Sequence, residues 1–215
     1  MTVVCPVLRP PSLSIWNAFT LEVIAMERNC MIGFRTVERN QMPPERLSEL
    51  VAAAQADPAA FGPLYDRYLQ PVYRYLYSRL GNAHEAEDVT SQTFIAAYEA
   101  LPRYREQGQF AAWLFRIARS KMNDHFRRNR FEVGLDAAKR AVAGYDALGE
   151  VIHDEELDRL QSLIKKLNPE EQDLIRLRYV ADLSFSEMAD LIGKREDAVK
   201  KSIYRLLERL KGQME

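Results

Sequence analysis

The sequence predicts an all-α protein made of two small helical domains joined by a flexible linker. Three observations lead to this fold class. Apolar residues recur at helical spacing from about residue 46 to residue 211, and residue types typical of helix caps divide this stretch into separate helices. β-branched alternation never persists for four residues beside a turn signal, so no strand is expected. Residues 131–153 contain three glycines and no strong period, which is typical of a linker.

The chain divides into a tail, a first helical domain, a linker and a second helical domain. Their expected bounds are 1–45, 46–130, 131–153 and 154–213. The tail holds five prolines and no sustained periodicity, so it is expected to be poorly ordered. Because Met26, Met31 and Met42 are alternative translation starts, part of the tail is also interpreted as an over-extended reading frame.

The first domain is expected to open with capped helices. Asp57 followed by Pro58 is an N-cap with a first-turn proline. Pro71 interrupts the apolar run that follows, so a kink or a break is expected near Leu69. Gly81 can adopt the left-handed conformation that ends a helix.

Two further helices complete this domain. Asn82, with Glu85 three residues later, has the form of a capping box and predicts a helix through Ala100. The next helix is expected over residues 110–130, with an apolar stripe on one side and cations on the other. Trp113 lies on the apolar stripe, so we expect it to anchor the core.

The second domain is predicted to contain four helices. They are expected over residues 155–167, 169–179, 184–192 and 196–211. Asn168 and Ser184 each precede a glutamate by three residues, which indicates an N-cap at both positions. Gly193 permits a sharp turn between the last two helices.

The last two helices have the layout of a helix-turn-helix. A small Ala189 allows them to cross closely, and Val199 and Ile203 are expected to be buried between them. The polar face of the last helix carries Arg195, Lys200, Lys201, Ser202, Arg205 and Arg209. A cationic helix of this kind suits the DNA major groove, although the spacing alone also fits any short helical hairpin.

Charge is strongly segregated, although the formal net charge is only −1. Residues 103–130 hold eight cations and two acids, and residues 194–211 hold seven cations and three acids. Between them, residues 131–158 hold eight acids and two cations. The pattern indicates two positive surfaces joined by an acidic connector, while solvated helix faces would explain either basic run taken alone.

Several functional classes are disfavoured by the composition. Both cysteines lie in the tail and the three histidines are scattered, so neither a disulfide framework nor a metal site is expected. The sequence contains no nucleophile with a base, no paired-carboxylate motif and no phosphate loop, so we expect neither an enzyme nor a cofactor. It contains no long apolar run and no signal peptide, so a cytoplasmic protein without membrane insertion is predicted.

Two stretches, one in each domain, resemble a known family. LYDRYLQPVYRYLYSRLGNAHEAEDVTSQTFIAAYEAL (64–101) and FAAWLFRIARSKMNDHFRR (110–128) resemble region two of bacterial sigma factors. RLRYVADLSFSEMADLIG, followed by AVKKSIYRLLERL, resembles region four of the same proteins. The two regions occur in the family order with a short linker between them, which is typical of the extracytoplasmic-function type. The resemblance covers roughly residues 46–211.

The resemblance implies a sigma factor that binds core RNA polymerase and directs promoter-specific initiation. The implied partners are the clamp helices of the largest polymerase subunit, the flap of the second-largest subunit and promoter DNA. An anti-sigma factor is a further candidate partner. The alternative is a helix-turn-helix regulator that never joins polymerase. That alternative does not explain why residues 64–128 resemble region two.

The resemblance also implies three functional surfaces. The polymerase-binding surface comprises Glu87, Asp88, Ser91, Gln92 and Phe94. The minus-ten surface, which recognises and melts DNA, comprises Tyr104, Gln107, Gln109, Arg116, Arg119, Asn123 and Arg127. The minus-thirty-five surface comprises Arg195, Lys200, Lys201, Ser202 and Arg205.

Some residues depart from the family pattern. Ser91 and Gln92 stand where glutamine and an acid are more usual, which is expected to weaken the polymerase contact. Ser120 replaces a common asparagine, and Ser202 replaces a frequent arginine. The sequence therefore predicts the surfaces but not the promoter bases that they read.

Overall fold

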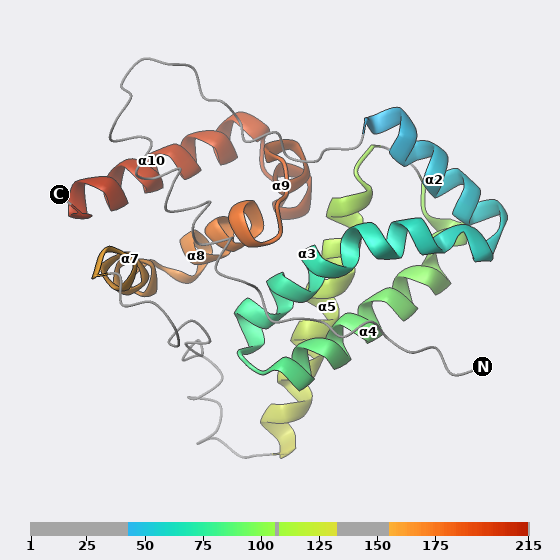
Figure 1. Ribbon diagram of the computed structural model, residues 1–215, viewed down its shortest axis with the longest axis horizontal. Coiled ribbons are helices and arrows are strands. Elements are labelled where there is room, and N and C mark those ends of the chain that lie inside the picture. The colour runs from blue at the N-terminus through green and yellow to red at the C-terminus, as the bar shows by residue number, and fades with distance from the viewer. Residues whose placement is uncertain (1–42, 106–107, 133–154, 215) are drawn as a thin grey trace.

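The computed structural model describes residues 43–105, 108–132 and 155–214. Every regular element in these ranges is helical, and the helices form two units (Figure 1). The predicted tail up to residue 42 and the predicted linker from residue 133 onward lie outside the described residues. Helix α2 (Pro44–Ala56) begins within the stretch assigned to the tail, with Pro44 in its first turn.

The first unit continues with three longer helices and two short 3-10 turns. Their bounds are η1 (Pro58–Phe61), α3 (Gly62–Leu80), α4 (Ala83–Ala100), η2 (Leu101–Arg103) and α5 (Phe110–Glu132). Gly81 ends α3 at a φ of 72°, as predicted. The Asn82 side chain accepts a hydrogen bond from the Glu85 amide at 3.2 Å. The Glu85 carboxylate lies 2.8 Å from the His125 ring instead of accepting a bond from the Asn82 amide. The capping box is therefore only half formed.

A kink or a break was predicted near Leu69; helix α3 is a single helix across Pro71, so there is no break. A proline in a helix interior removes one backbone hydrogen bond and strains the preceding turn. Leu69, Val72 and Tyr73 are all buried on either side of Pro71. Burying both halves of the helix in one core offsets the local cost of the proline.

The second unit contains a helix-turn-helix packed on two further helices. Its elements are α7 (Glu155–Lys165), α8 (Pro169–Ile175), η3 (Arg176–Val180), α9 (Phe185–Ile192) and α10 (Glu196–Met214). Asn168 and Ser184 both form complete capping boxes, which confirms the two predicted N-caps. The helix predicted to reach Tyr179 is α-helical only to Ile175 and continues as the π-helical turn η3.

The π-helical turn lets Arg178 reach across the following loop. The Arg178 guanidinium donates to the Leu183 carbonyl at 2.9 Å and lies 4.2 Å from the centre of the Phe185 ring. These contacts fix the chain between η3 and α9, where Asp182 adopts a φ of 56°. The sequence pattern gave no sign of this change in helical geometry, because π-helical turns follow from packing rather than from local propensity.

We expect Ser184→Ala to lower the free energy of unfolding of the second unit by about 1 kcal/mol, because the α9 amides lose their cap. Ser162→Ala is a matched control on α7, where the hydroxyl donates to the Arg159 carbonyl of its own helix. Chemical denaturation of the two variants measures the difference. Equal stability would show that the Ser184 cap contributes little.

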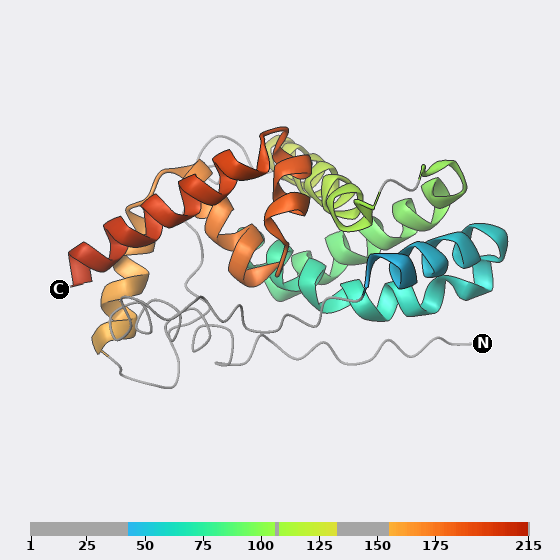
Figure 2. The same ribbon diagram turned by 90° about the horizontal axis from the view of Figure 1, so that it is seen from above.

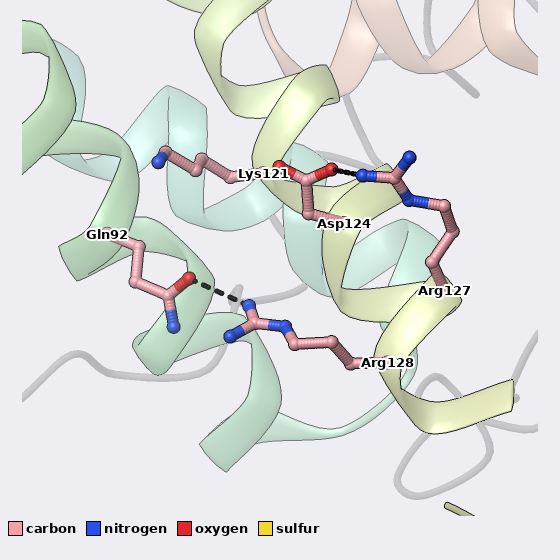
Figure 3. A pocket seen from close by; sticks show the side chains of 5 residues that line it. All are labelled: Gln92, Lys121, Asp124, Arg127 and Arg128. Atoms are coloured by element: carbon pink, nitrogen blue, oxygen red, sulfur yellow. Dashed lines mark hydrogen bonds and ion pairs between the residues drawn. The ribbon is translucent and has the colours of Figure 1, made fainter. Parts of the chain in front are cut away.

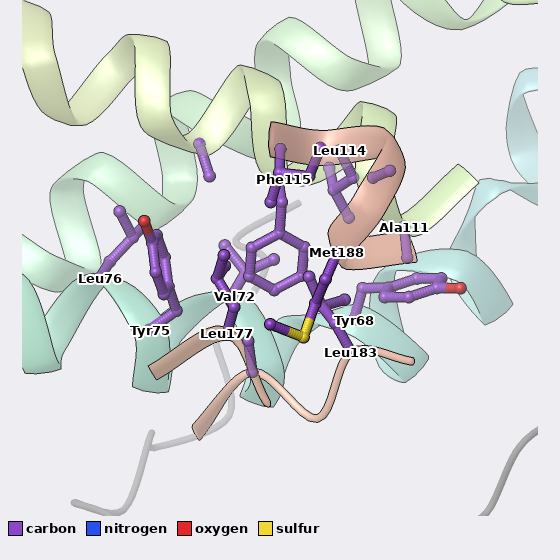
Figure 4. Close-up of a cluster of buried hydrophobic side chains, with 14 of the residues drawn as sticks. Tyr68, Val72, Tyr75, Leu76, Ala111, Leu114, Phe115, Leu177, Leu183 and Met188 are labelled. Atoms are coloured by element: carbon purple, nitrogen blue, oxygen red, sulfur yellow. The ribbon is translucent and has the colours of Figure 1, made fainter. Parts of the chain in front are cut away.

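The two units share one hydrophobic core. Figure 4 shows Leu177, Leu183 and Met188 of the second unit packed among buried residues of α3 and α5. The partners labelled there are Tyr68, Val72, Tyr75, Leu76, Ala111, Leu114 and Phe115. Helix α9 lies beside α5, and η3 lies beside α3, whereas α2 and the end of α10 occupy opposite ends of the molecule (Figures 1 and 2). This shared core places the second unit against the cationic helix α5.

Candidate nucleic-acid and polymerase surfaces

The cationic face of α10 points away from the core. Val199 and Ile203 are each 1% exposed, as the helix-turn-helix pattern predicted. All five residues of the minus-thirty-five surface are exposed: Arg195, Lys200, Lys201, Ser202 and Arg205. Burial of the opposite stripe therefore holds the four of them on α10 outward, and Arg195 directly precedes the helix.

The turn that presents α10 has the predicted geometry. Gly193 ends α9 at a φ of 68°, a conformation that favours glycine, and Ala189 is buried at the crossing. Arg209 lies 2.7 Å from Glu171 in an ion pair that ties α10 to α8. The helix is therefore seated on its own unit.

The segment before α5 is held by aromatic packing and by α2. The Tyr104 ring is half-buried and lies 4.7 Å from Trp113 and 5.7 Å from Phe110, measured between ring centres. The Gln55 side-chain amide donates to the carbonyls of Leu101 and Tyr104 at 3.0 and 2.7 Å. Gln107 of the minus-ten surface lies outside the described residues.

The second unit engages three residues of the minus-ten surface, two on α5 and one directly before it. The Arg116 guanidinium donates to the Asp190 carbonyl at 2.6 Å and to its carboxylate at 2.8 Å. Arg119 lies 3.1 Å from the Asp173 carboxylate, and Gln109 donates to the Ser186 hydroxyl at 3.2 Å. Asn123 and Arg127 are exposed farther along the same helix.

Asp173 is the centre of the polar contact between the units. Its carboxylate accepts a hydrogen bond from the Tyr75 hydroxyl at 3.1 Å and lies 3.8 Å from Arg79. Burial and the Asp173 charge raise the pKa of Tyr75, so its hydroxyl stays protonated and donates. Burial and the nearby charge of Arg79 lower the pKa of Arg176. A single buried carboxylate thus lies among three arginines.

A pocket between α4 and α5 extends the cationic surface. Figure 3 shows that Lys121, Asp124, Arg127 and Arg128 of α5 line it together with Gln92 of α4. Arg128 donates to the Gln92 side chain at 3.2 Å, and Arg127 pairs with Asp124. Sequence reasoning missed Lys121 and Arg128 as site residues, although both belong to the basic run. Gln92 therefore lies where the polymerase-binding and minus-ten surfaces meet.

The polymerase-binding surface follows one face of α4. Asp88 and Ser91 are exposed, and Glu87 is half-buried. Phe94 instead lies in the core, 5% exposed, with its ring 4.8 Å from the ring of Tyr65. Phe94 thus supports α4 from within rather than contributing to its outer face.

The same face of α4 carries two exposed apolar side chains. Among the described residues, Ile95 and Tyr98 are the large hydrophobic residues that stay exposed, at 59% and 45%. They follow Asp88 and Ser91 at helical spacing, so the four side chains lie on one stripe. Sequence reasoning missed both. Their helical spacing from the polar Asp88 and Ser91 is the signal that could have found them.

The described residues offer little that would suit metal chemistry. In the three described ranges, no group of three or more His, Cys, Asp or Glu residues could hold a metal ion. None of the helices in those ranges has the length and apolar character needed to cross a membrane.

Two family models match the chain, each on one structural unit. Sigma-70 region 2 matches residues 64–132, which cover α4, α5 and most of α3. Sigma-70 region 4 matches residues 157–210, which cover most of the second unit. Together the matches span more than half of the chain, in the order that the sequence predicted.

Named relatives belong to the same family. The ECF RNA polymerase sigma factor BldN of Streptomyces coelicolor is 39% identical over 77% of this chain and 64% of BldN. The ECF RNA polymerase sigma factor SigD of Mycobacterium tuberculosis H37Rv is 31% identical over 80% of this chain and 86% of SigD. A solved structure of CnrH in complex with the cytosolic domain of CnrY is 27% identical, with a TM-score of 0.54, over 79% of this chain and 96% of CnrH.

The order of the two regions, the helical units that carry them and the relatives agree. The chain therefore belongs to the sigma-70 family and is an extracytoplasmic-function sigma factor, a member of the class that directs RNA polymerase to promoters for transcription initiation.

Proposed function

We propose that this sigma factor binds core RNA polymerase through α4, opens the minus-ten element with α5 and reads the minus-thirty-five element with α10. The observation that supports this division most directly is the placement of the two family regions. Region 2 carries an exposed acidic and apolar face on α4 together with the cationic helix α5, and region 4 presents the cationic helix α10. A regulator that never joins polymerase would have no use for the exposed face of α4.

Polymerase docking is assigned to Asp88, Ser91, Ile95 and Tyr98, with Glu87 and Gln92 at the edges. An acidic, partly apolar helix face suits a basic partner with apolar side chains, because charge steers the encounter and apolar burial holds the complex. We assign the contact to the clamp helices of the largest polymerase subunit. We assign the contact with the flap of the second-largest polymerase subunit to the second unit of this chain.

Promoter melting is assigned to α5 and the segment before it. A protein that opens DNA without ATP must trap bases that leave the stack, which favours aromatic and amide groups beside cations. Tyr104, Gln107, Gln109 and Asn123 are the proposed base contacts. Arg116, Arg119 and Arg127 are the proposed phosphate contacts, and the pocket that contains Lys121 and Arg128 adds two more cations.

Duplex recognition is assigned to the exposed face of α10. The major groove admits a helix and displays a distinct pattern of donors and acceptors for each base pair. Lys200 and Arg205 lie on the exposed side of α10, opposite the buried Val199 and Ile203. We propose that Lys200, Ser202 and Arg205 face bases, and that Arg195 and Lys201 bind phosphates.

The chain is proposed to act in the cytoplasm as a non-catalytic subunit. Sigma factors are not enzymes in the usual sense, and the absence of any activity of its own is part of this proposal. An anti-sigma factor is a proposed partner, since CnrH was solved in complex with the cytosolic domain of CnrY. The proposed domain bounds are 46–130 and 154–213, close to the regions that the family models match.

The test is run-off transcription with core polymerase from the source organism on its own genomic fragments. We expect core enzyme plus the chain to produce discrete transcript starts that core enzyme alone does not produce. The chain should also co-purify with core polymerase. Binding to DNA without any association with core polymerase would instead establish the regulator alternative.

A further inference from the structure

We propose that a pocket between the two units is a binding site for a small organic phosphate. The phosphate group lies against the cations Arg79, Arg119 and Lys194, and the apolar body of the ligand packs on Leu174 and Leu191. The site goes beyond the proposed function, because a sigma factor needs no small ligand to bind polymerase or promoter DNA. Its ligand is an effector of the chain.

Both units build this pocket, which has a volume of about 540 Å³. Arg79 near the end of α3 and Arg119 on α5 form the side of the first unit. The start of α8, the end of α9 and the turn after α9 form the other side, with Pro169, Ile192 and Lys194 among the lining residues. Pockets that hold small organic ligands commonly have volumes of this order.

The lining contains more cations than carboxylates. Three cations face the two carboxylates of Glu170 and Asp173. The Asp173 carboxylate already accepts a hydrogen bond from a tyrosine and lies 3.1 Å from Arg119, whereas Arg79 is farther away at 3.8 Å. Lys194 is exposed, and among the described residues no carboxylate forms an ion pair with it. Positive charge at Arg79 and Lys194 is therefore available to an anion.

Arg176 adds to the positive charge beside the pocket. Burial and then the charge of Arg79 lower the pKa of Arg176, while Asp173 and Tyr75 act in the opposite direction. A guanidinium whose pKa is lowered by a neighbouring cation lies where positive charge is incompletely compensated. A phosphate monoester carries a charge of about −1.5 to −2 near neutral pH, so it matches this excess better than a single carboxylate.

The apolar part of the lining favours an organic ligand over free phosphate. Leu174, Leu191 and Ile192 line the pocket on the side of the second unit. Leu191 is buried and the other two are half-buried, so their remaining exposed surface faces the pocket or the solvent around it. Inorganic phosphate leaves this surface in contact with water, whereas a small apolar body covers it.

The bound ligand stabilises the contact between the units, because its partners belong to both. If the units move apart, the ligand loses the contacts on one side. Binding therefore raises the stability of the packed arrangement by an amount that depends on ligand concentration relative to Kd. The chain can in this way respond to the level of a phosphorylated metabolite.

The experiment titrates the full chain with phenyl phosphate by isothermal calorimetry. Inorganic phosphate and benzyl alcohol are the comparison probes, since the first lacks the apolar body and the second lacks the charge. Phenyl phosphate should bind one molecule per chain, about tenfold more tightly than inorganic phosphate, because apolar burial adds to the charge contact. Benzyl alcohol should show no saturable binding.

Two variants test the assigned cations and the apolar lining. Arg79→Gln with Lys194→Gln should weaken binding of phenyl phosphate by about tenfold or more, which corresponds to the loss of charge-assisted hydrogen bonds. The matched control, Arg46→Gln with Lys166→Gln, removes one exposed arginine and one exposed lysine outside the pocket and should bind as the wild type does. Leu174→Ala should weaken binding of phenyl phosphate and leave binding of inorganic phosphate unchanged.

Lys194→Gln alone keeps the test valid if loss of Arg79 disturbs the packing of the units. Lys194 is exposed, so the fold should tolerate this change, and affinity for phenyl phosphate should still fall. Thermal unfolding provides a second measurement: saturating phenyl phosphate should raise the unfolding midpoint of the wild type and of the control, and should raise it less in the pocket variants.

Three outcomes would overturn the proposal. They are the absence of saturable phenyl phosphate binding, equal binding by the pocket and control variants, and displacement of phenyl phosphate by a short single-stranded DNA. The last outcome would make the pocket part of the promoter surface. Run-off transcription by the wild-type chain without added ligand tests the proposed function separately, so failure of the pocket proposal leaves that function standing.

Discussion

Glu87→Lys with Asp88→Lys should reduce affinity for core RNA polymerase by about 100-fold or more. Lysines placed against a basic partner repel it at a cost of several kcal/mol. A loss of about 2.7 kcal/mol in binding free energy corresponds to a 100-fold loss of affinity. Asp88 is exposed and Glu87 is half-buried near the surface, so the fold should tolerate both changes. The measurement is a pull-down or titration with purified core enzyme, with helicity and thermal unfolding recorded for each variant.

Two further variants separate charge from apolar contact on α4. Asp66→Lys with Glu49→Lys applies the same charge change to exposed positions on α3 and α2, and it should leave polymerase binding intact. Ile95→Ser should weaken binding without any change in charge, since 59% of this residue is exposed in the free chain and available for burial. Unchanged affinity in the lysine variant of α4 would mean that polymerase docks elsewhere.

Loss of the α10 cations and loss of the α5 contacts should produce defects that a bubble template distinguishes. Lys200→Ala with Arg205→Ala should weaken the closed complex on duplex promoter, by about 1–3 kcal/mol for each base contact. A template melted in advance should not rescue this variant, because the upstream contact is still missing. Both residues are exposed on a helix whose buried side is unchanged, so the fold should persist.

Asn123→Ala should instead impair opening and be partly rescued by the bubble. Asn123 is exposed on α5, which makes it a cleaner test than Arg119, whose side chain also pairs with Asp173. Arg119→Ala is expected to show the same rescue, combined with looser contact between the units. Lys166→Ala on the second unit is the control, since it is exposed and outside all three surfaces.

Transcription from duplex and bubble templates at one fixed salt concentration is the measurement. Salt must stay constant because each phosphate contact changes the salt dependence of binding. Equal rescue of the α10 and α5 variants would show that duplex recognition and promoter melting are not divided between α10 and α5 as proposed.

The local features of this protein could be predicted from its amino-acid sequence. The caps at Asn168 and Ser184 and the left-handed turns at Gly81 and Gly193 were predictable because each depends on residues within one helical turn. Burial of Val199 and Ile203 followed from helical period alone. The family order of the two regions was likewise readable from the chain.

Tertiary structure decided which faces meet. Helical period shows that a stripe is apolar but does not name its partner, so the core shared by α3, α5 and the second unit was not predictable. The Tyr75 hydroxyl meets Asp173 across 98 positions of sequence, and no local signal spans that distance. Continuity of α3 through Pro71 and the exposure of Ile95 and Tyr98 also follow from packing. The free energy of burying apolar side chains is summed over the entire contact between packed helices. This sum outweighs the conformational preference of any single residue.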